Sequence, residues 1–252
     1  MTPPGATALR DLDAVIFDMD GVVTQTAVVH ASSWKKLFDA FLRQRSEETG
    51  EPFVPFDEHG DYERYVDGKN RYDGVRSFLA SRGIELPEGS PDDPPGSDTV
   101  QALGNDKDTY FLEQVRTDGV RPYESTVRLI RELRERGVAI GLVSASRNAE
   151  EVLAGAGVLE LFDARVDGVV SAERGLPGKP DPATFLEAAR ELNVEPARAA
   201  VVEDALSGVA AGRAGNFGLV VGVARAGQTD ALRDAGADVV VADLAELEDD
   251  VR

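Results

Sequence analysis

Two aspartates, Asp18 and Asp20, follow a short apolar run over residues 14–17, and a glycine comes directly after them. In an extended segment, residues i and i+2 share a face and lie roughly 6–7 Å apart. Two carboxylates held that close repel, and each raises the pKa of the other unless a cation lies between them. A strand that ends at a cation site and a strand followed by a solvated Asp/Gly turn both fit this stretch alone.

Polar residues follow two further apolar runs in the same way. Ser144 and Ser146 follow one of these runs, and Glu203 and Asp204 follow the other. If the runs are parallel strands of one sheet, their carboxyl ends meet at one edge, where open sheets bind their ligands. Two acidic pairs at that edge would surround one cation, and oxygen ligands suit Mg²⁺. The sequence therefore predicts a magnesium site formed by Asp18, Asp20, Glu203 and Asp204.

Lys179 lies in the rigid segment GLPGKPDP, directly before a predicted helix. Lysines in such loops are usually solvated, but a fixed ammonium beside the acidic site would bind phosphate oxygens. The segment is not a phosphate-binding P-loop, because Pro180 stands where Ser or Thr would follow the lysine. The chain also lacks a G-x-G-x-x-G after the first strand and a G-x-S-x-G elbow. Its two histidines, His30 and His59, are too few for a histidine-based zinc site.

The elements that must position these residues are predicted from hydrophobic periodicity. From about residue 120, helical patterns alternate with short apolar runs, which is typical of right-handed βαβ units and a doubly wound parallel sheet. We expect strands at 14–17, 138–146, 164–170, 199–205, 217–223 and 237–243. We expect helices between them at 125–137, 148–157, 182–193 and 206–215. The fold class is therefore α/β.

Residues 50 to 120 show helical patterns without a convincing strand, and residues 30 to 115 are assigned to one helical region. We expect helices at 26–45, 72–84 and 99–116, with a Pro/Gly/Asp-rich loop at 86–98. This region is a helical insertion after the first strand of the sheet. The predicted domains are residues 1–28 with 118–252, and residues 29–117.

Composition limits the classes of partner. The 252 residues include 27 Lys and Arg against 46 Asp and Glu, a formal net charge of −19, which argues against nucleic acid or an anionic membrane surface. A small phosphorylated ligand needs only a local cluster of cations or a metal. The absence of cysteine excludes disulfides and thiolate chemistry. No run approaches the roughly 20 apolar residues of a membrane span, and the first residues lack a signal-peptide core, so we predict a soluble, cytoplasmic protein.

Four segments together resemble the haloacid dehalogenase superfamily: DMDGVV, Ser144 after a strand, Lys179 in GKPDP, and VVEDALSG. The resemblance implies that the insertion is an α-helical cap on a Rossmann-like core. It implies that Asp18 is a nucleophile that becomes an aspartyl phosphate, and that Asp20 is the general acid and base. Ser144 and Lys179 would hold the phosphoryl group. Asp20, through its backbone carbonyl, would bind Mg²⁺ with Asp18, and Glu203 and Asp204 would complete the site directly or through water.

Within the superfamily the chain resembles the β-phosphoglucomutase subfamily in DGVVTQTAVVHASSW, SASRN and the cap segment VDGKNR. The resemblance implies eight substrate-binding residues: Thr26, His30, Trp34, Arg71, Lys107, Ser146, Arg147 and Asn148. Solvated helix cations at 71 and 107, and cap packing at 30 and 34, are the alternatives. Two residues depart from the subfamily, since Gln25 replaces an aspartate and Asp67 replaces a lysine.

Three functions follow from these residues. The first is a mutase that moves phosphate between C1 and C6 of a hexose through a bisphosphate. The second is a phosphatase that hydrolyses a small sugar phosphate, and the third is a non-enzymatic regulatory protein, which the intact set of polar residues disfavours. A carboxylate nucleophile, cations on the phosphoryl oxygens and a nearby acid suffice chemically for phosphoryl transfer. Mutase and phosphatase share every core residue, but Arg71 with Arg147 favours the mutase, because a hydrolase of a monophosphate has less need of a distal pair of cations. The phosphatase is kept as the alternative, and the oligomeric state is not predicted.

Overall fold

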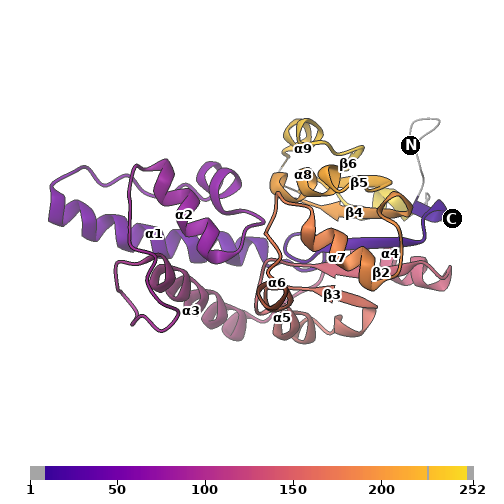
Figure 1. Cartoon of the computed structure of the whole chain (residues 1–252), viewed down its shortest axis with the longest axis horizontal. Coiled ribbons are helices and arrows are strands. Elements are labelled where there is room, and N and C mark those ends of the chain that lie inside the picture. Colours follow the sequence, from indigo (N-terminus) through magenta and orange to yellow (C-terminus); the bar gives the residue numbers. More distant parts are fainter. Residues whose placement is uncertain (1–8, 226, 249–252) are drawn as a thin grey trace. The chain divides into compact units, whose positions relative to one another are not determined.

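The computed structural model describes residues 9–225 and 227–248, and the chain divides into two compact units (Figure 1). The core unit comprises the described residues of Met1–Gln25 and Val120–Arg252. The helical unit is Thr26–Gly119. Each unit has its own hydrophobic core.

The core unit contains a six-stranded sheet in the order β3-β2-β1-β4-β5-β6, with all neighbouring strands parallel. Its strands are β1 Ala14–Asp18, β2 Ala139–Val143, β3 Ala164–Val166, β4 Ala199–Glu203, β5 Leu219–Val223 and β6 Val239–Val241. The central strand β1 is buried at every position, because strands on both sides and helices on both faces cover it. The predicted doubly wound parallel sheet is confirmed.

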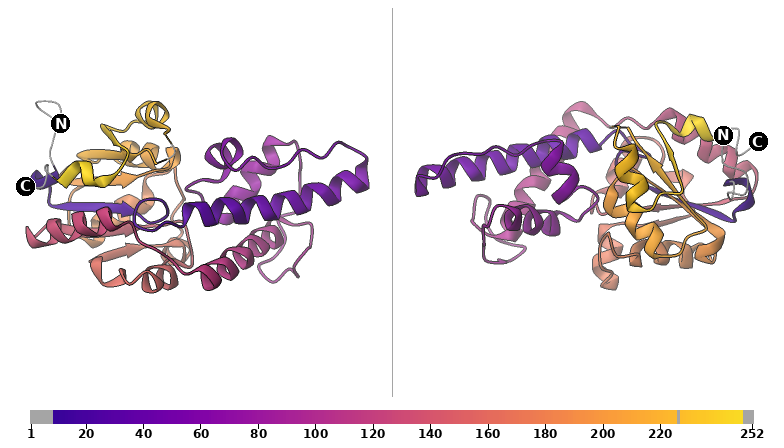
Figure 2. Two further views of the ribbon diagram at one scale, coloured as in Figure 1. Left: turned by 180° about the vertical axis from the view of Figure 1, so that it is seen from behind. Right: turned by 90° about the horizontal axis from the view of Figure 1, so that it is seen from above.

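Helices cover both faces of this sheet (Figures 1 and 2). On one face, α7 packs against β1, β2 and β3, α8 packs against β4 and β5, and α9 packs against β5 and β6, while α4 packs against β2 on the other face. The helices of the unit are α4 Glu124–Glu135, α5 Ala149–Gly155, α6 Gly168–Arg174, α7 Ala183–Glu191, α8 Leu206–Ala214 and α9 Thr229–Ala235. Short 3-10 helices lie at Leu9–Asp11, Leu159–Leu161, Pro196–Arg198 and Leu244–Leu247.

The strands expected at 138–146, 199–205 and 237–243 are shorter than predicted and end at Val143, Glu203 and Val241. Two further differences in the core unit are larger. The predicted strand at 164–170 ends at Val166, because the Asp167 side chain accepts hydrogen bonds from the backbone N–H groups of Val169 and Val170 and caps α6. The short helix α9 between β5 and β6 was not predicted, since its seven residues bury only Leu232 and show little periodicity.

The helical unit consists of α1 Ala27–Thr49, the π-helix η2 Tyr62–Val66, α2 Arg71–Ser81 and α3 Val100–Asp118. Its core is aromatic, with the rings of Phe38 on α1 and Phe78 on α2 4.0 Å apart. Helix α1 is longer than predicted, since it passes through the polar residues after Arg45 and ends at Gly50 in the left-handed region. No described helix of either unit is long and apolar enough to cross a membrane.

Both connections of the insertion are tied together inside the core unit. Thr24 and Pro122 form an isolated bridge, and the Gln25 backbone N–H donates to the Arg121 carbonyl at 2.9 Å. The Gln25 side-chain amide also donates to the Pro122 carbonyl at 3.2 Å. The residue that departs from the subfamily pattern is therefore used to join the outgoing and returning segments. The other departure, Asp67, follows the π-helix and donates its N–H to the Tyr62 carbonyl at 3.0 Å.

Candidate active site

A buried ammonium lies between two buried carboxylates at the carboxyl edge of the sheet. Lys179 Nζ donates to Asp18 Oδ1 at 2.5 Å and also donates to Glu203 Oε1. The three side chains are almost inaccessible, and the ammonium lies 5.1 Å from the centre of the Phe185 ring. Since buried charges need partners, this arrangement fixes the position of all three groups.

The sheet register explains why Asp18 and Glu203 meet. Phe17 of β1 lies opposite Val202 of β4, so the next residue of each parallel strand lies at the same edge. Glu203 Oε2 accepts the backbone N–H of Ala205 at 2.9 Å, which orients its other oxygen toward Lys179. Both oxygens of Glu203 therefore have partners within the core unit.

The pKa values of this group are shifted by burial and by the charges themselves. Burial raises the pKa of Asp18 well above its usual value, with Lys179 opposing the shift and Glu203 and Asp20 adding to it. Burial alone would lower the pKa of Lys179, but the carboxylates of Asp18 and Glu203 outweigh it and raise that pKa. Lys179 is therefore an ammonium at neutral pH.

Carboxylate oxygens of Asp18, Glu203 and Asp204 lie within 4.8 Å of one another. Such hard oxygen donors fit a divalent cation such as Mg²⁺. Asp204 is half-buried, and so is Asp20, which is not one of the three. The structure thus brings three of the four predicted metal ligands together and places the fourth two residues after Asp18.

Two glycines leave the space that this site requires. Gly21 adopts φ +84°, and a Cβ at that position would overlap the Asp204 carboxylate. A Cβ at Gly208, on the first turn of α8, would overlap the Glu203 carboxylate. Both glycines lie inside the motifs DMDGVV and VVEDALSG, but sequence reasoning assigned them no role. The available signal was their position shortly after the acidic residues of each motif.

The segment that follows β2 is held by its own serines. Ser144 directly follows Val143, which pairs with Asp18, and its Oγ accepts the Ser146 N–H at 3.1 Å. Ser146 Oγ accepts the Asn148 N–H at 3.1 Å, and the Ser146 carbonyl accepts the Gly168 N–H at 2.9 Å. Arg147 is exposed. The predicted residues of SASRN therefore lie on the loop next to the strand that carries Asp18.

In the helical unit, a second buried cation lies among aromatic rings. Lys107 Nζ lies 2.5 Å from His30 Nδ1 and 4.8 Å from the centre of the Phe111 ring. His30 stacks on Phe111 with ring centres 4.1 Å apart, and Trp34 is buried in the aromatic core of the unit. The structure therefore brings together three of the predicted residues and excludes the solvated alternative for Lys107. Packing accounts for Trp34.

Arg71 and Thr26 lie elsewhere in the helical unit. Arg71 begins α2, and its Nη1 pairs with Asp108 at 2.6 Å while its Nη2 donates to the Tyr72 hydroxyl at 3.3 Å. Burial would lower the pKa of Arg71, but Asp108 outweighs it and raises that pKa. The solvated alternative is wrong here too. Thr26 is buried before α1, and its carbonyl accepts the His30 N–H at 2.9 Å.

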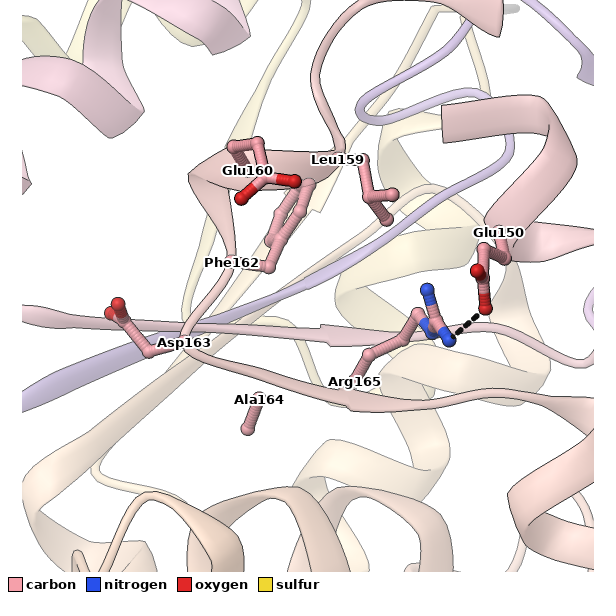
Figure 3. A pocket seen from close by; sticks show the side chains of 7 residues that line it. All are labelled: Glu150, Leu159, Glu160, Phe162, Asp163, Ala164 and Arg165. Atoms are coloured by element: carbon pink, nitrogen blue, oxygen red, sulfur yellow. Dashed lines mark hydrogen bonds and ion pairs between the residues drawn. The ribbon is translucent and has the colours of Figure 1, made fainter. Parts of the chain in front are cut away.

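A shallow hollow of about 290 Å³ lies beside the edge strand β3 (Figure 3). Its lining includes the acidic side chains Glu150, Glu160 and Asp163, together with Arg165. Arg165 pairs with Glu150 at 2.6 Å, as the dashed line in Figure 3 shows, and with Asp167 at 3.1 Å. The lining thus combines three acidic groups with one neutralised cation, which does not suit an anionic sugar phosphate.

Comparison with known proteins shows the family to which the chain belongs. The model of a family of hydrolases, the haloacid dehalogenase-like hydrolases, matches residues 12–216. The chain belongs to this family. A Mycobacterium tuberculosis protein named β-phosphoglucomutase is 53% identical over 93% of this chain and 90% of its own length. A Bacillus subtilis β-phosphoglucomutase is 32% identical over 94% of this chain and 92% of its own length. The crystal structure of a β-phosphoglucomutase from Clostridium difficile matches with a TM-score of 0.71 and 26% identity, over 94% of this chain and 93% of that one.

Proposed function

We propose that the protein is a magnesium-dependent β-phosphoglucomutase, which converts β-glucose 1-phosphate into glucose 6-phosphate through an aspartyl phosphate. The observation that carries this proposal is the 53% identity, over nearly the whole chain, to the Mycobacterium tuberculosis protein of that name. The buried group of Asp18, Lys179 and Glu203 supplies the chemistry that the proposal requires.

Asp18 is the proposed nucleophile. In the phosphorylated enzyme, the C6 hydroxyl of β-glucose 1-phosphate attacks the phosphorus, the bond from phosphorus to Asp18 breaks, and Asp20 takes the hydroxyl proton. The product is glucose 1,6-bisphosphate. The bisphosphate then reorients so that its C1 phosphate faces Asp18. Asp18 attacks this phosphorus, the bond from phosphorus to the C1 oxygen breaks, and Asp20 returns the proton to that oxygen. The product is glucose 6-phosphate, and the enzyme is again phosphorylated on Asp18.

Lys179 and Ser144 are proposed to hold the phosphoryl group. Lys179 is a fixed ammonium whose two carboxylate partners prevent it from turning away, and a fixed charge stabilises a phosphoryl transition state better than a mobile one. The Ser144 side chain follows β2, the strand next to that of Asp18, so its hydroxyl is proposed to donate to a phosphoryl oxygen.

Asp18, Asp204 and the Asp20 backbone carbonyl are proposed to hold Mg²⁺. Glu203 has both oxygens engaged by Lys179 and Ala205, so we assign it to the orientation of Lys179 and to the metal only through water. When bound, the ion offsets the repulsion among the carboxylates and the charge on the phosphoryl oxygens.

Substrate recognition is assigned to both domains, with residues 29–117 as the cap. Arg71 and Arg147 are proposed to bind the phosphate that is not transferred, and Ser146 and Asn148 to position that phosphate. Thr26, His30, Trp34 and Lys107 are proposed to shape the substrate-binding part of the cap. A cytoplasmic location stays a prediction.

A phosphatase is the second candidate, because the matching family model is one of hydrolases and both reactions need the same core residues. Phosphorus NMR separates the two. With β-glucose 1-phosphate, Mg²⁺ and a trace of the 1,6-bisphosphate, a mutase forms glucose 6-phosphate without inorganic phosphate. Release of inorganic phosphate at the rate of substrate loss would instead identify a phosphatase.

A further inference from the structure

The loop after β5 reaches back to the acidic site through Arg225. Arg225 Nε donates to the Gly21 carbonyl at 2.7 Å, and its Nη1 donates to Asp243 at 2.9 Å. The guanidinium also lies 3.4 Å from the centre of the Tyr123 ring. Only 18% of the side chain is exposed, so these contacts are less weakened by solvent than those of a surface pair.

The contact with Gly21 matters because Gly21 lies against the Asp204 carboxylate. Gly21 follows Asp20 directly and leaves no room for a Cβ beside the Asp204 carboxylate. The same β5 loop contacts the second acidic segment, since Gln228 Nε2 donates to the Asp204 backbone carbonyl at 3.3 Å. One loop therefore binds the backbone on both sides of the predicted metal site.

The Tyr123 ring, on which the Arg225 guanidinium stacks, is attached to the loop that contains Gly21. The Tyr123 backbone N–H donates to the Val23 carbonyl at 2.9 Å, so the ring under the guanidinium is attached two residues beyond Gly21. Asp243, the other partner, caps the 3-10 helix at Leu244–Leu247 by accepting the Ala245 N–H at 2.9 Å. Tyr123 and Asp243, the two side chains that contact the guanidinium, are thus themselves held in place.

We propose that Arg225 is a positioning residue that holds the Asp20–Gly21 backbone against Asp204 and so sets the spacing of the oxygen ligands for Mg²⁺. This inference rests on the proposed function, because it takes the acidic group to be a metal site. Groups that orient ligands in this way typically contribute 10- to 100-fold to metal affinity. Arg225 acts only through the loop that it holds.

The test compares Arg225→Gln and Arg225→Lys with Arg213→Gln. Arg213 makes contacts of the same kind elsewhere in the core unit, since its Nε donates to the Gly236 carbonyl at 3.0 Å and its guanidinium pairs with Asp238. The readout is the MgCl₂ concentration that gives half of the maximal increase in melting temperature, without sugar phosphate. We expect this concentration to rise about tenfold or more for Arg225→Gln. It should be unchanged for Arg213→Gln.

Arg225→Lys should raise this MgCl₂ concentration less than Arg225→Gln does, because lysine keeps the positive charge. It should still raise it, because an ammonium cannot reproduce the contacts that a planar guanidinium makes with the Gly21 carbonyl, Asp243 and the Tyr123 ring together. If Arg225→Gln does not fold, the titration of Arg225→Lys decides the question. A folded Arg225 variant with the wild-type Mg²⁺ dependence would overturn the inference and leave Arg225 a purely structural residue. A wild-type protein that Mg²⁺ does not stabilise would contradict the metal site of the proposed function, which is a different outcome.

Discussion

At the residue scale, one ammonium holds two carboxylates of the site together. Lys179 pairs with Asp18 and with Glu203, and all three side chains are removed from solvent. Removing one member of a buried ion group is costly because the remaining charges keep their desolvation penalty without the compensating attraction. The ion pairs that place the proposed nucleophile, Asp18, therefore also contribute to the stability of the core unit.

We expect Lys179→Met to lower the free energy of unfolding by about 3–5 kcal/mol, because Asp18 and Glu203 would remain buried without a cation. Urea denaturation in metal-free buffer measures this loss. The matched control is Lys36→Met, since Lys36 forms an exposed pair with Glu113 at 3.5 Å and should contribute little. Equal stability changes for the two variants would show that Lys179 does not hold the carboxylates together.

At the scale of single elements, β4 and α8 are joined by a close approach. Gly208 lies on the first turn of α8, where any side chain would meet the Glu203 carboxylate at the end of β4. Glycine at this position lowers the helix propensity of α8, but it leaves the space in which the Glu203 carboxylate reaches Lys179.

Gly208→Ala separates these two effects. Helix propensity alone predicts a gain of up to about 1 kcal/mol, but the overlap with a buried carboxylate predicts a loss of about 1–3 kcal/mol together with reduced turnover. Gly155→Ala in α5 is the control, because nothing lies within 4 Å of an added Cβ there. It should be neutral or slightly stabilising in thermal denaturation. A stabilised, fully active Gly208→Ala would mean that Glu203 does not need this space.

Much of the sheet could be predicted because buried parallel strands read as short apolar runs separated by amphipathic helices. The end of β3 at Val166 could not, since three residues show no periodicity and Asp167 caps the next helix through a local hydrogen bond. The acidic residues were predictable from their place after strands. The pairing of Arg71 with Asp108 was not, because it depends on how α2 packs against α3.

At the scale of the whole molecule, the proposed function divides the work between two units. The core unit carries the reacting groups, and the helical unit carries Arg71, whose guanidinium pairs with Asp108. If Arg71 binds the phosphate that is not transferred, its contribution depends on the substrate. A small ester with one phosphate would not use it.

We expect Arg71→Ala to reduce kcat/KM for β-glucose 1-phosphate by about 10- to 150-fold, the effect of one charge-assisted hydrogen bond. Hydrolysis of p-nitrophenyl phosphate should hardly change. Arg76→Ala on the same helix is the control, because Arg76 pairs with Asp73 at 2.6 Å on the exposed side and should affect neither substrate. Equal losses of Arg71→Ala on both substrates would make Arg71 a residue that only supports the fold.

The proposed mechanism depends most on Asp18, the residue that is proposed to carry the phosphoryl group. The direct measurement is rapid acid quenching of the enzyme with glucose 1,6-bisphosphate and Mg²⁺, followed by mass spectrometry of its peptides. We predict one phosphoryl group on the peptide that contains Asp18, and neither this modification nor turnover in Asp18→Asn, whose circular dichroism should match the wild type. A phosphoryl group on another residue, or substantial turnover by Asp18→Asn, would contradict the account.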